Sequence, residues 1–201
     1  MGAKVKICGL MRRADVEAVN ELLPDYAGFV LTGGFSHSIC EKTFFELIRE
    51  LDGRIRRVGV FVDEPPNSIA SFGEYLDMIQ LHGAEDDETI RRVRELTGKP
   101  VIKAFIVKGP DDIDRAKDCP ADYVLLDAGT GSGVSFDHSL IKDFPREYFL
   151  AGGLGADNTA HAVEALHPYA VDASSRLETE GRKDITKMAA YVNAARGGDN
   201  E

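Results

Sequence analysis

Short apolar runs rich in β-branched and aromatic residues alternate along the chain with longer segments in which apolar residues recur at helical spacing. Eight runs have the pattern of strands: KVKICGL, YAGFVLT, RVGVFVD, MIQLHG, PVIKAFIV, YVLLDA, YFLAGGL and AVDASS. Five intervening segments have the pattern of amphipathic helices: ADVEAVNELL, KTFFELIREL, DETIRRVREL, NTAHAVEAL and DITKMAAYVNAA. Several of these open on Asp or Asn, which cap helix N-termini. Strand and helix therefore alternate to the end of the chain.

The spacing of the strands predicts how many units the fold contains. They begin near residues 4, 26, 56, 78, 100, 123, 148 and 170, a step of roughly 22 to 30 residues. One βα unit has about this length. Eight units in series predict an α/β fold, a single-domain (β/α)8 TIM barrel over residues 1–196, with a tail at 197–201 that is expected to fray. A doubly wound open sheet needs the same alternation and is the competing architecture.

Alternation of side chains within each strand separates the two faces of the predicted sheet. In the first strand Lys6 and Cys8 share one face, and Val5 and Ile7 share the other. The polar faces of the fourth, sixth and eighth strands carry Gln80, His82, Asp127, Asp172 and Ser174. Because the apolar faces must meet the helices, we expect the polar faces to converge on the barrel lumen near its C-terminal mouth, where this fold places active sites. On any one strand a polar end equally fits the start of a loop, but the shared parity favours the lumen.

Composition and charge exclude several kinds of partner. With 201 residues, of which 43% are apolar, the chain can bury a full core. A formal charge of -10 and the absence of a basic stripe predict no binding to nucleic acid or to an anionic membrane. The N-terminus lacks the apolar core of a signal peptide, and no apolar run is long enough to span a membrane. These features predict a cytoplasmic protein.

The cysteines do not predict a disulfide framework or a metal knuckle. Cys8, Cys40 and Cys119 are odd in number and widely spaced. No cluster of His or carboxylate residues has metal-ligand spacing, so no metal site is expected. A free cysteine is most often a small buried hydrophobic residue, and this is the expectation for Cys40 and Cys119. For Cys8 that alternative stands beside a chemical role.

A phosphate site is predicted near the seventh and eighth strands. The run LAGGLGADN, residues 150–158, passes from a strand through two glycines to a helix start, and DASSR, residues 172–176, follows one unit later. Glycine allows close approach of backbone N–H groups, and these loops are the usual phosphate cradle of the fold. The predicted phosphate-binding residues are Gly152, Gly153, Ser174, Ser175 and Arg176. A second glycine-rich loop, GTGSG at 129–133, lacks dinucleotide spacing and is interpreted as a flexible rim loop.

Together these motifs resemble one enzyme family. The segments KICGL, GFVL, VGVFVD, IQLHG, LLDA, GSGVSFD, LAGGLGADN, VDASS and LETEGRKD are similar to those of phosphoribosylanthranilate isomerase, and the match runs from the first strand to the last helix. The resemblance implies a cofactor-free (β/α)8 barrel that catalyses the Amadori rearrangement of tryptophan biosynthesis. Its partner is then a small phosphoribosyl molecule, and the sequence leaves monomer and homodimer open.

The resemblance implies that Cys8 is the general base and Asp127 the general acid. The chemistry needs both, because one group protonates the furanose oxygen as the ring opens to a Schiff base and another removes a proton from the adjacent carbon. Strands one and six lie three places apart round the ring, so their inward groups can face each other across a ribose. Asp127 must carry its proton, and Cys8 must become a thiolate from a reference pKa of about 8.5, with Lys6 as a candidate to assist.

The polar lumen residues are expected to contact the substrate. Lys6, Gln80 and His82 belong to this predicted substrate-binding set, and His82 is interpreted as a hydrogen-bonded lumen residue rather than a catalyst.

Two positions depart from the family pattern. The family commonly has a Ser-x-Arg stretch after the second strand, whose arginine holds the anthranilate carboxylate, but here Ser36 and His37 are followed by Ser38. A hydroxyl cannot replace a bidentate guanidinium. We therefore hypothesise that Arg12 or Arg13, in the loop after the first strand, supplies the missing cation. The second departure is Arg176, where the family usually has glycine.

Two rival functions remain open from the sequence. The histidine-pathway Amadori isomerase would have aspartates at the ends of strands one and five, where this chain has Cys8 and Lys103. A non-catalytic barrel that binds a phosphorylated ligand would need neither Cys8 nor Asp127.

Overall fold

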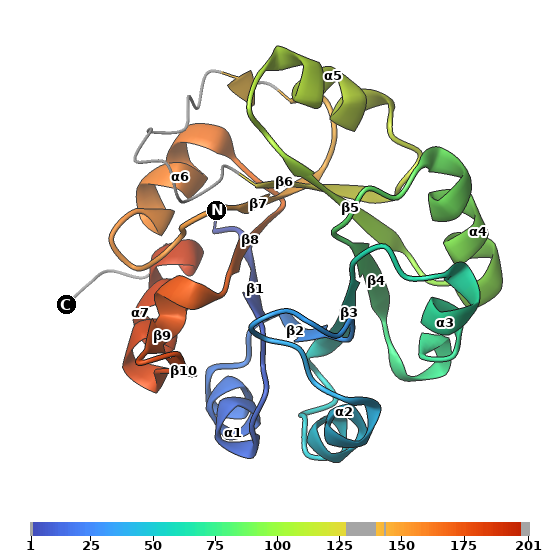
Figure 1. The fold of residues 1–201 in the computed structure, drawn as a ribbon. Helices are drawn as coiled ribbons and strands as arrows, with labels where there is room; N and C mark the ends of the chain where they lie inside the picture. Colours follow the sequence, from blue (N-terminus) through green and yellow to red (C-terminus); the bar gives the residue numbers. More distant parts are fainter. Residues whose placement is uncertain (1, 128–139, 143, 198–201) are drawn as a thin grey trace.

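Eight parallel strands close into a barrel in the computed structural model, which describes residues 2–127, 140–142 and 144–197 (Figure 1). The strands pair in sequence order and the first pairs with the last, so the predicted TIM barrel is confirmed and the open sheet is wrong. The strands are β1 (Lys4–Cys8), β2 (Tyr26–Val30), β3 (Arg56–Phe61), β4 (Met78–Leu81), β5 (Val101–Ile106), β6 (Tyr123–Asp127), β7 (Tyr148–Ala151) and β8 (Ala170–Ala173). Each begins within one residue of its predicted start.

Helices surround the barrel in the order of the sequence (Figure 1). They are α1 (Arg13–Leu22), α2 (Glu41–Ile48), α3 (Pro66–Ala70), α4 (Asp87–Thr97), α5 (Pro110–Asp118), α6 (Thr159–Leu166) and α7 (Ile185–Arg196). Between them lie the short 3-10 helices η1 (Gly73–Tyr75) and η3 (Ser175–Leu177), and the hairpin strands β9 (Glu178–Thr179) and β10 (Arg182–Lys183). The hairpin follows β8 after η3 and therefore lies at the C-terminal end of the barrel.

Helix caps and the number of buried apolar positions explain which helices could be predicted from the sequence. The predicted cap at Asp184 is confirmed, because its side chain accepts hydrogen bonds from the backbone N–H groups of Thr186 and Lys187. The cap of α4 is Asp86, one residue before the predicted opening at Asp87, and Asn158 lies at the start of α6 without a side-chain cap bond. The pattern missed α3 and α5 because their buried faces are small. Only Ile113 and Ala116 are buried along α5, which is too few apolar positions to reveal a helical period.

The predicted parity of the strands is confirmed. Val5 and Ile7 belong to the apolar layer between the sheet and the helices, whereas Ile102 and Leu125 fill the lumen. Lys6 also points into the lumen and is fully buried there.

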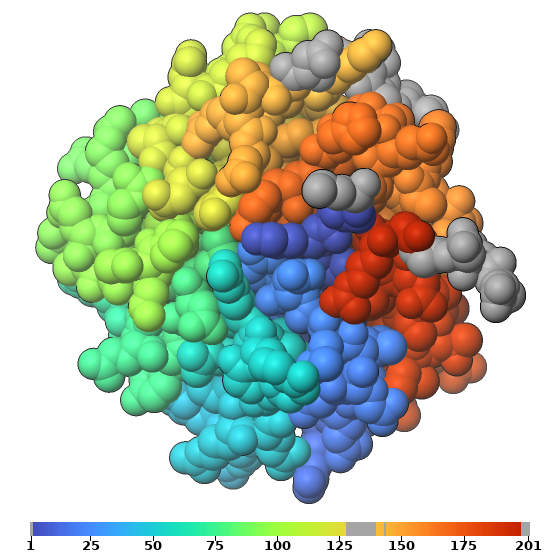
Figure 2. Space-filling model, turned by 180° about the vertical axis from the view of Figure 1, so that it is seen from behind, coloured from blue at the N-terminus to red at the C-terminus, as the bar shows by residue number. Residues whose placement is uncertain are grey.

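Aromatic rings fill the N-terminal end of the barrel. Tyr26, Tyr123 and Tyr169 all pack against Phe149, with ring centroids 5.4 to 5.8 Å apart, and the Lys4 ammonium donates a hydrogen bond to the Tyr169 hydroxyl. Seen from behind, the sequence colours run round the molecule in order, with the first segment beside the last helix (Figure 2). The ring layer leaves the opposite, C-terminal end for a ligand.

Two expectations about the periphery have different outcomes. Cys119 is buried as expected, but Cys40 is exposed at the start of α2, so the expectation that it is buried is wrong. A helix start faces solvent, which is why Cys40 does not join the core. Within the described residues the last element ends at Arg196; most of the predicted tail and the GTGSG rim loop lie outside the described residues.

Candidate active site

A cavity of about 440 Å³ opens at the C-terminal end of the barrel. Each strand contributes a residue at or near its carboxyl end: Cys8, Val30, Val60, Gln80, Ile106, Asp127, Ala151 and Ala173. The loops after β2, β7 and β8 supply most of the rest of the lining. A volume of this size suits a small organic molecule.

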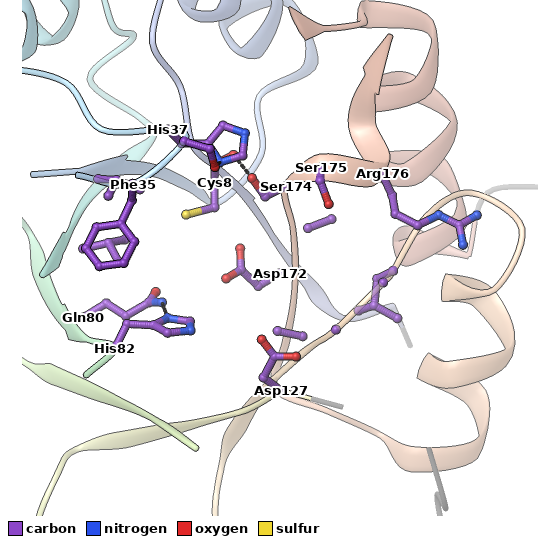
Figure 3. Close-up of a pocket in the computed structure, with 18 of the residues that line it drawn as sticks. Cys8, Phe35, His37, Gln80, His82, Asp127, Asp172, Ser174, Ser175 and Arg176 are labelled. Atoms are coloured by element: carbon purple, nitrogen blue, oxygen red, sulfur yellow. Dashed lines mark hydrogen bonds between the residues drawn. The ribbon is translucent and has the colours of Figure 1, made fainter. Parts of the chain in front are cut away.

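Cys8 and Asp127 line the same cavity from opposite sides. Figure 3 shows the two side chains facing inward with Asp172 between them. Cys8 is the last residue of β1 and Asp127 the last of β6, so two rigid strands position them. The pair therefore meets the geometric requirement for acting on one bound molecule.

The environment of Cys8 contains opposing electrostatic effects. Burial raises the pKa of the Cys8 thiol above its ordinary value, whereas the positive charge of Lys6 lowers it. Burial alone would lower the pKa of Lys6, but the negative charges of Asp172 and Cys8 outweigh it and keep the ammonium protonated. Lys6 is thus a fixed cation beneath the thiol, and it does not itself line the cavity.

Asp172 is a site residue whose role the sequence did not reveal. Its Oδ2 lies 2.8 Å from the Lys6 Nζ, and its Oδ1 is buried with no hydrogen-bond partner within the described residues. The strand parity had placed Asp172 in the lumen, but only its contact with Lys6 shows that it is paired to the cation beneath Cys8. An unpartnered carboxylate oxygen at a cavity is an acceptor for a ligand hydroxyl.

Gln80 and His82 form a hydrogen-bonded pair in the lumen, as expected for His82. The Gln80 Nε2 donates to the His82 Nδ1 over 2.8 Å (Figure 3). Burial lowers the pKa of His82 below its ordinary value, although the charge of Asp127 opposes this. The imidazole is therefore neutral near pH 7, and this arrangement leaves its proton on Nε2.

The predicted phosphate residues come together at one end of the cavity. Gly152 and Gly153 have φ angles of 100° and 61°, a backbone conformation that residues other than glycine rarely adopt. With Ser174, Ser175 and Arg176 they line the same cavity. This end of the cavity contains glycines, serine hydroxyls and a guanidinium, a composition typical of anion-binding sites.

Salt bridges and hydrogen bonds fix the loops around this end. The Arg176 Nη2 lies 2.7 and 2.9 Å from the two carboxylate oxygens of Asp157, which joins the loops after β7 and β8. The Ser174 hydroxyl donates to the Cys8 carbonyl, and Lys183 donates to the Ser174 carbonyl. Ser174 is therefore tied both to the end of β1 and to the β10 strand that carries Lys183.

The structure does not bring Arg12 and Arg13 to the cavity. The Arg12 Nη2 lies 2.8 Å from Asp15 at the start of α1, and the exposed Arg13 pairs with Glu17 and Glu50. The side chains that the loop after β2 directs into the cavity do not include Ser38, the position considered from the sequence. Ser38 donates its hydroxyl to a backbone carbonyl, while the cavity is lined by Phe35, Ser36 and His37.

Comparison with known proteins agrees with this geometry. The sequence model of a family described as N-(5'-phosphoribosyl)anthranilate (PRA) isomerase matches residues 5–194, from the second residue of β1 into α7. The chain belongs to the PRA isomerase family. A relative named N-(5'-phosphoribosyl)anthranilate isomerase from Endomicrobium trichonymphae is 44% identical, over 96% of this chain and 98% of that protein.

Solved structures of PRA isomerases have the same fold. That of the Thermotoga maritima phosphoribosyl anthranilate isomerase superposes with a TM-score of 0.90 at 36% identity, covering 97% of this chain and 99% of the other. Another PRA isomerase, solved in complex with reduced 1-(o-carboxyphenylamino)-1-deoxyribulose 5-phosphate, gives a TM-score of 0.87 at 34% identity with the same coverage.

The described residues contain neither a membrane-spanning helix nor a metal-ligand cluster. No helix among them has the length and apolar character to cross a membrane. Likewise, the described residues contain no group of three or more His, Cys, Asp or Glu side chains placed to hold a metal ion.

Proposed function

We propose that the protein converts N-(5-phosphoribosyl)anthranilate to 1-(2-carboxyphenylamino)-1-deoxyribulose 5-phosphate, with Cys8 as general base and Asp127 as general acid. The observation that carries the proposal is that a thiol and a carboxyl group line one cavity, one end of which consists of glycines, serines and an arginine. Membership of the PRA isomerase family identifies the reaction, and the cavity supplies a group for each of its proton transfers.

The reaction needs no redox partner and uses both groups in turn. Asp127 gives its proton to the furanose oxygen as the bond from that oxygen to C1 breaks, and the nitrogen lone pair forms a Schiff base. The Cys8 thiolate then removes the proton from C2, and the released electron pair forms the C1–C2 double bond as the nitrogen recovers its lone pair. Proton return to C1 and loss of the hydroxyl proton at C2 yield the ketose.

Lys6 partly offsets the cost of forming the Cys8 thiolate in a buried site. Without a cation, burial would leave Cys8 protonated at neutral pH, since a free thiol with a pKa of about 8.5 is already only about 3% ionised at pH 7. Lys6 opposes burial from beneath, and Asp172 limits its effect. The base is therefore expected to gain activity as the pH rises above neutrality.

The substrate phosphate binds at the end formed by Gly152, Gly153, Ser174, Ser175 and Arg176. Backbone N–H groups, hydroxyls and a guanidinium match the oxygens of a phosphate monoester. Gln80 and His82, which face the lumen, contact the sugar or its amine. Each of these assignments follows from the lining of a single cavity.

The cation for the anthranilate carboxylate stays a prediction. Arg12 and Arg13 remain the hypothesised substitutes, but their present salt bridges would have to break for either to reach the cavity. Affinities of Arg12→Ala and Arg13→Ala for the product analogue decide the question, because unchanged affinity in both removes the hypothesis.

The position of Lys103 gives no support to the histidine-pathway reaction. Its ammonium lies 3.0 Å from Glu85 in a pair that is almost fully buried, and it does not line the cavity. β5 ends at Ile106, which is the residue of this strand that lines the cavity and is neither an acid nor a base. Only the isomerisation of phosphoribosylanthranilate is therefore proposed.

The decisive assay follows the fluorescence of freshly made phosphoribosylanthranilate after the protein is added. We expect turnover by the wild type and a loss of about 100-fold or more in kcat for Cys8→Ala and for Asp127→Asn. Cys40→Ala removes an exposed thiol outside the cavity and should change nothing. Near-normal turnover by either site variant would refute its role, and inactive wild type would refute the function.

A further inference from the structure

The cavity has an apolar side as well as an anion-binding end. Val30, Val60 and Val62 line it near β2 and β3, and two large apolar side chains stand at its rim. These two, Phe35 and Ile106, are 50% and 54% exposed. Within the described residues only four large apolar side chains are exposed, and two of them line this one cavity. Their position indicates a surface that can bind an apolar group of a ligand.

The proposed substrate has an apolar part that must lie on this side. Its phosphate is on C5 of the ribose and its aryl amine on C1, at the other end of the sugar. In Figure 3, Phe35 lies across Cys8, Asp172 and Asp127 from Ser175 and Arg176. With the phosphate at the serines and the sugar between Cys8 and Asp127, the aryl group is directed toward Phe35.

Hydrogen bonds hold the loop that carries Phe35. The Phe35 N–H donates to the Ser38 Oγ over 3.0 Å, and the same hydroxyl donates to the Thr32 carbonyl over 2.6 Å. The Ile39 N–H donates to the Val30 carbonyl, which ties the far end of the loop to β2. Because the backbone beside the ring is fixed before binding, less conformational entropy is lost when a ligand packs on it.

A second contact joins this loop to the segment after β8, on the other side of β1. The His37 Nε2 lies 2.8 Å from the Glu178 Oε1, and that oxygen also accepts a hydrogen bond from the Lys183 Nζ over 2.6 Å. Glu178 and Lys183 are 10% and 2% exposed, so the anchor is buried. His37 also packs closely over Gly9, the residue that follows the proposed base.

We propose that Phe35 is a specificity-determining residue that packs against the aromatic ring of the substrate, and that His37 and Glu178 act as positioning residues that hold its loop over the cavity. This inference rests on the proposed function, which supplies the aromatic ring. Phe35 gives the substrate ring a face to stack on. The contact between His37 and Glu178, called the brace below, sets the distance between that face and the sugar site.

Two ligands separate the aryl side from the phosphate end. One is reduced 1-(o-carboxyphenylamino)-1-deoxyribulose 5-phosphate, which carries the ring; the other is ribose 5-phosphate, which has the sugar and phosphate alone. We expect Phe35→Ala to weaken binding of the first about tenfold, the size of an aromatic contact together with its buried area, and to leave the second unchanged. Phe35→Tyr should restore affinity because it keeps the ring.

The brace is tested by His37→Gln and Glu178→Gln. We expect each to raise KM for phosphoribosylanthranilate with little change in kcat, and to weaken the ring-bearing ligand more than ribose 5-phosphate. Ile185→Ala removes another exposed apolar side chain, one outside the cavity, and serves as the matched control.

The outcomes distinguish this inference from the proposed function. Equal weakening of both ligands by Phe35→Ala, or weakening of neither, would overturn the aryl contact even if the wild type turns over its substrate. Inactive wild type with ring-selective weakening would overturn the proposed function and support the contact. If Glu178→Gln does not fold, His37→Gln decides the brace alone, and an unchanged KM there overturns it.

Discussion

Replacement of Lys6 by Met removes the cation beneath Cys8 and keeps an apolar side chain of similar length. The Lys6 Nζ and the Cys8 Sγ lie 3.1 and 2.7 Å from the point that a Cβ on Gly28 would occupy, so the two atoms are within about 6 Å of each other. Lys6 is fully buried, so neither water nor salt screens it strongly. The substitution therefore removes the attraction between Lys6 and the thiolate, and with it the ion pair between Lys6 and Asp172.

The expected size of the effect follows from this distance. At about 6 Å and an effective dielectric constant of about 20, a thiolate and an ammonium attract each other by about 3 kcal/mol. Asp172, which lies 2.8 Å from the same ammonium, repels the thiolate in both the wild type and the variant, so its charge does not reduce the loss. A loss of about 3 kcal/mol reduces the thiolate population at neutral pH by about a hundredfold. We expect kcat/KM at pH 7 to fall by that factor.

The sign of the pH dependence is the sharper measurement. Burial has already raised the pKa of Cys8, and loss of Lys6 raises it further, so the increase of kcat/KM with pH should begin at a higher pH in Lys6→Met than in the wild type. Asp172→Asn removes the opposing carboxylate and should move the increase to lower pH. Lys6→Arg keeps the charge and serves as the control. Profiles that coincide in wild type and Lys6→Met would refute the electrostatic account.

Folding is controlled by a double variant. Lys6→Met leaves Asp172 buried without its counter-ion, and breaking a buried pair in this way costs about 3 to 5 kcal/mol. Lys6→Met combined with Asp172→Asn removes both charges and should recover the melting temperature without recovering activity at pH 7.

Three further substitutions test other parts of the structure. Gly28→Ala would place a Cβ 2.7 Å from the Cys8 Sγ, so we expect kcat to fall and urea unfolding to show a loss of about 1 to 3 kcal/mol; unchanged kcat would contradict the close packing. Lys103→Met leaves the buried Glu85 carboxylate without its counter-ion, with only the backbone N–H groups of Asp63 and Gly83 donating to it, and it should lower the unfolding free energy by about 3 kcal/mol, more than the double replacement of Lys103 and Glu85 does. Arg176→Ala should weaken inhibition by inorganic phosphate about threefold to tenfold, because the guanidinium is 45% exposed, and equal inhibition constants would remove it from the phosphate site.

The barrel and the strand faces could be predicted because the same constraint repeats eight times. Each strand is apolar toward the helices, so the residues of opposite parity must enter the lumen. One such strand, with Lys6 and Cys8 opposite Val5 and Ile7, would have been ambiguous on its own. Closure of the ring then brings strand ends that are distant in sequence into one cavity, which is how Cys8 and Asp127 meet.

Pairing between lumen residues was not predictable from parity alone. The sequence indicated that Lys6 and Asp172 share a compartment, but the 2.8 Å contact between them depends on the register of β1 against β8. In that register Lys6 lies opposite Asp172, so the two charges neutralise each other inside the lumen. Register is set by packing across the whole barrel, and no local sequence pattern encodes it.

The loop after β2 shows why loop residues were misjudged. Counting from the family motif led to Ser38 as the position that faces the ligand, yet its hydroxyl is occupied by the backbone of Thr32 and Phe35. A serine that bonds to nearby backbone turns the chain, and the turn directs Phe35 and His37 into the cavity instead. In a loop, such hydrogen bonds determine where a side chain points, and its position in a sequence motif does not. The positions of Phe35 and His37 at the cavity thus follow from the hydrogen bonds of Ser38 to the backbone of this loop.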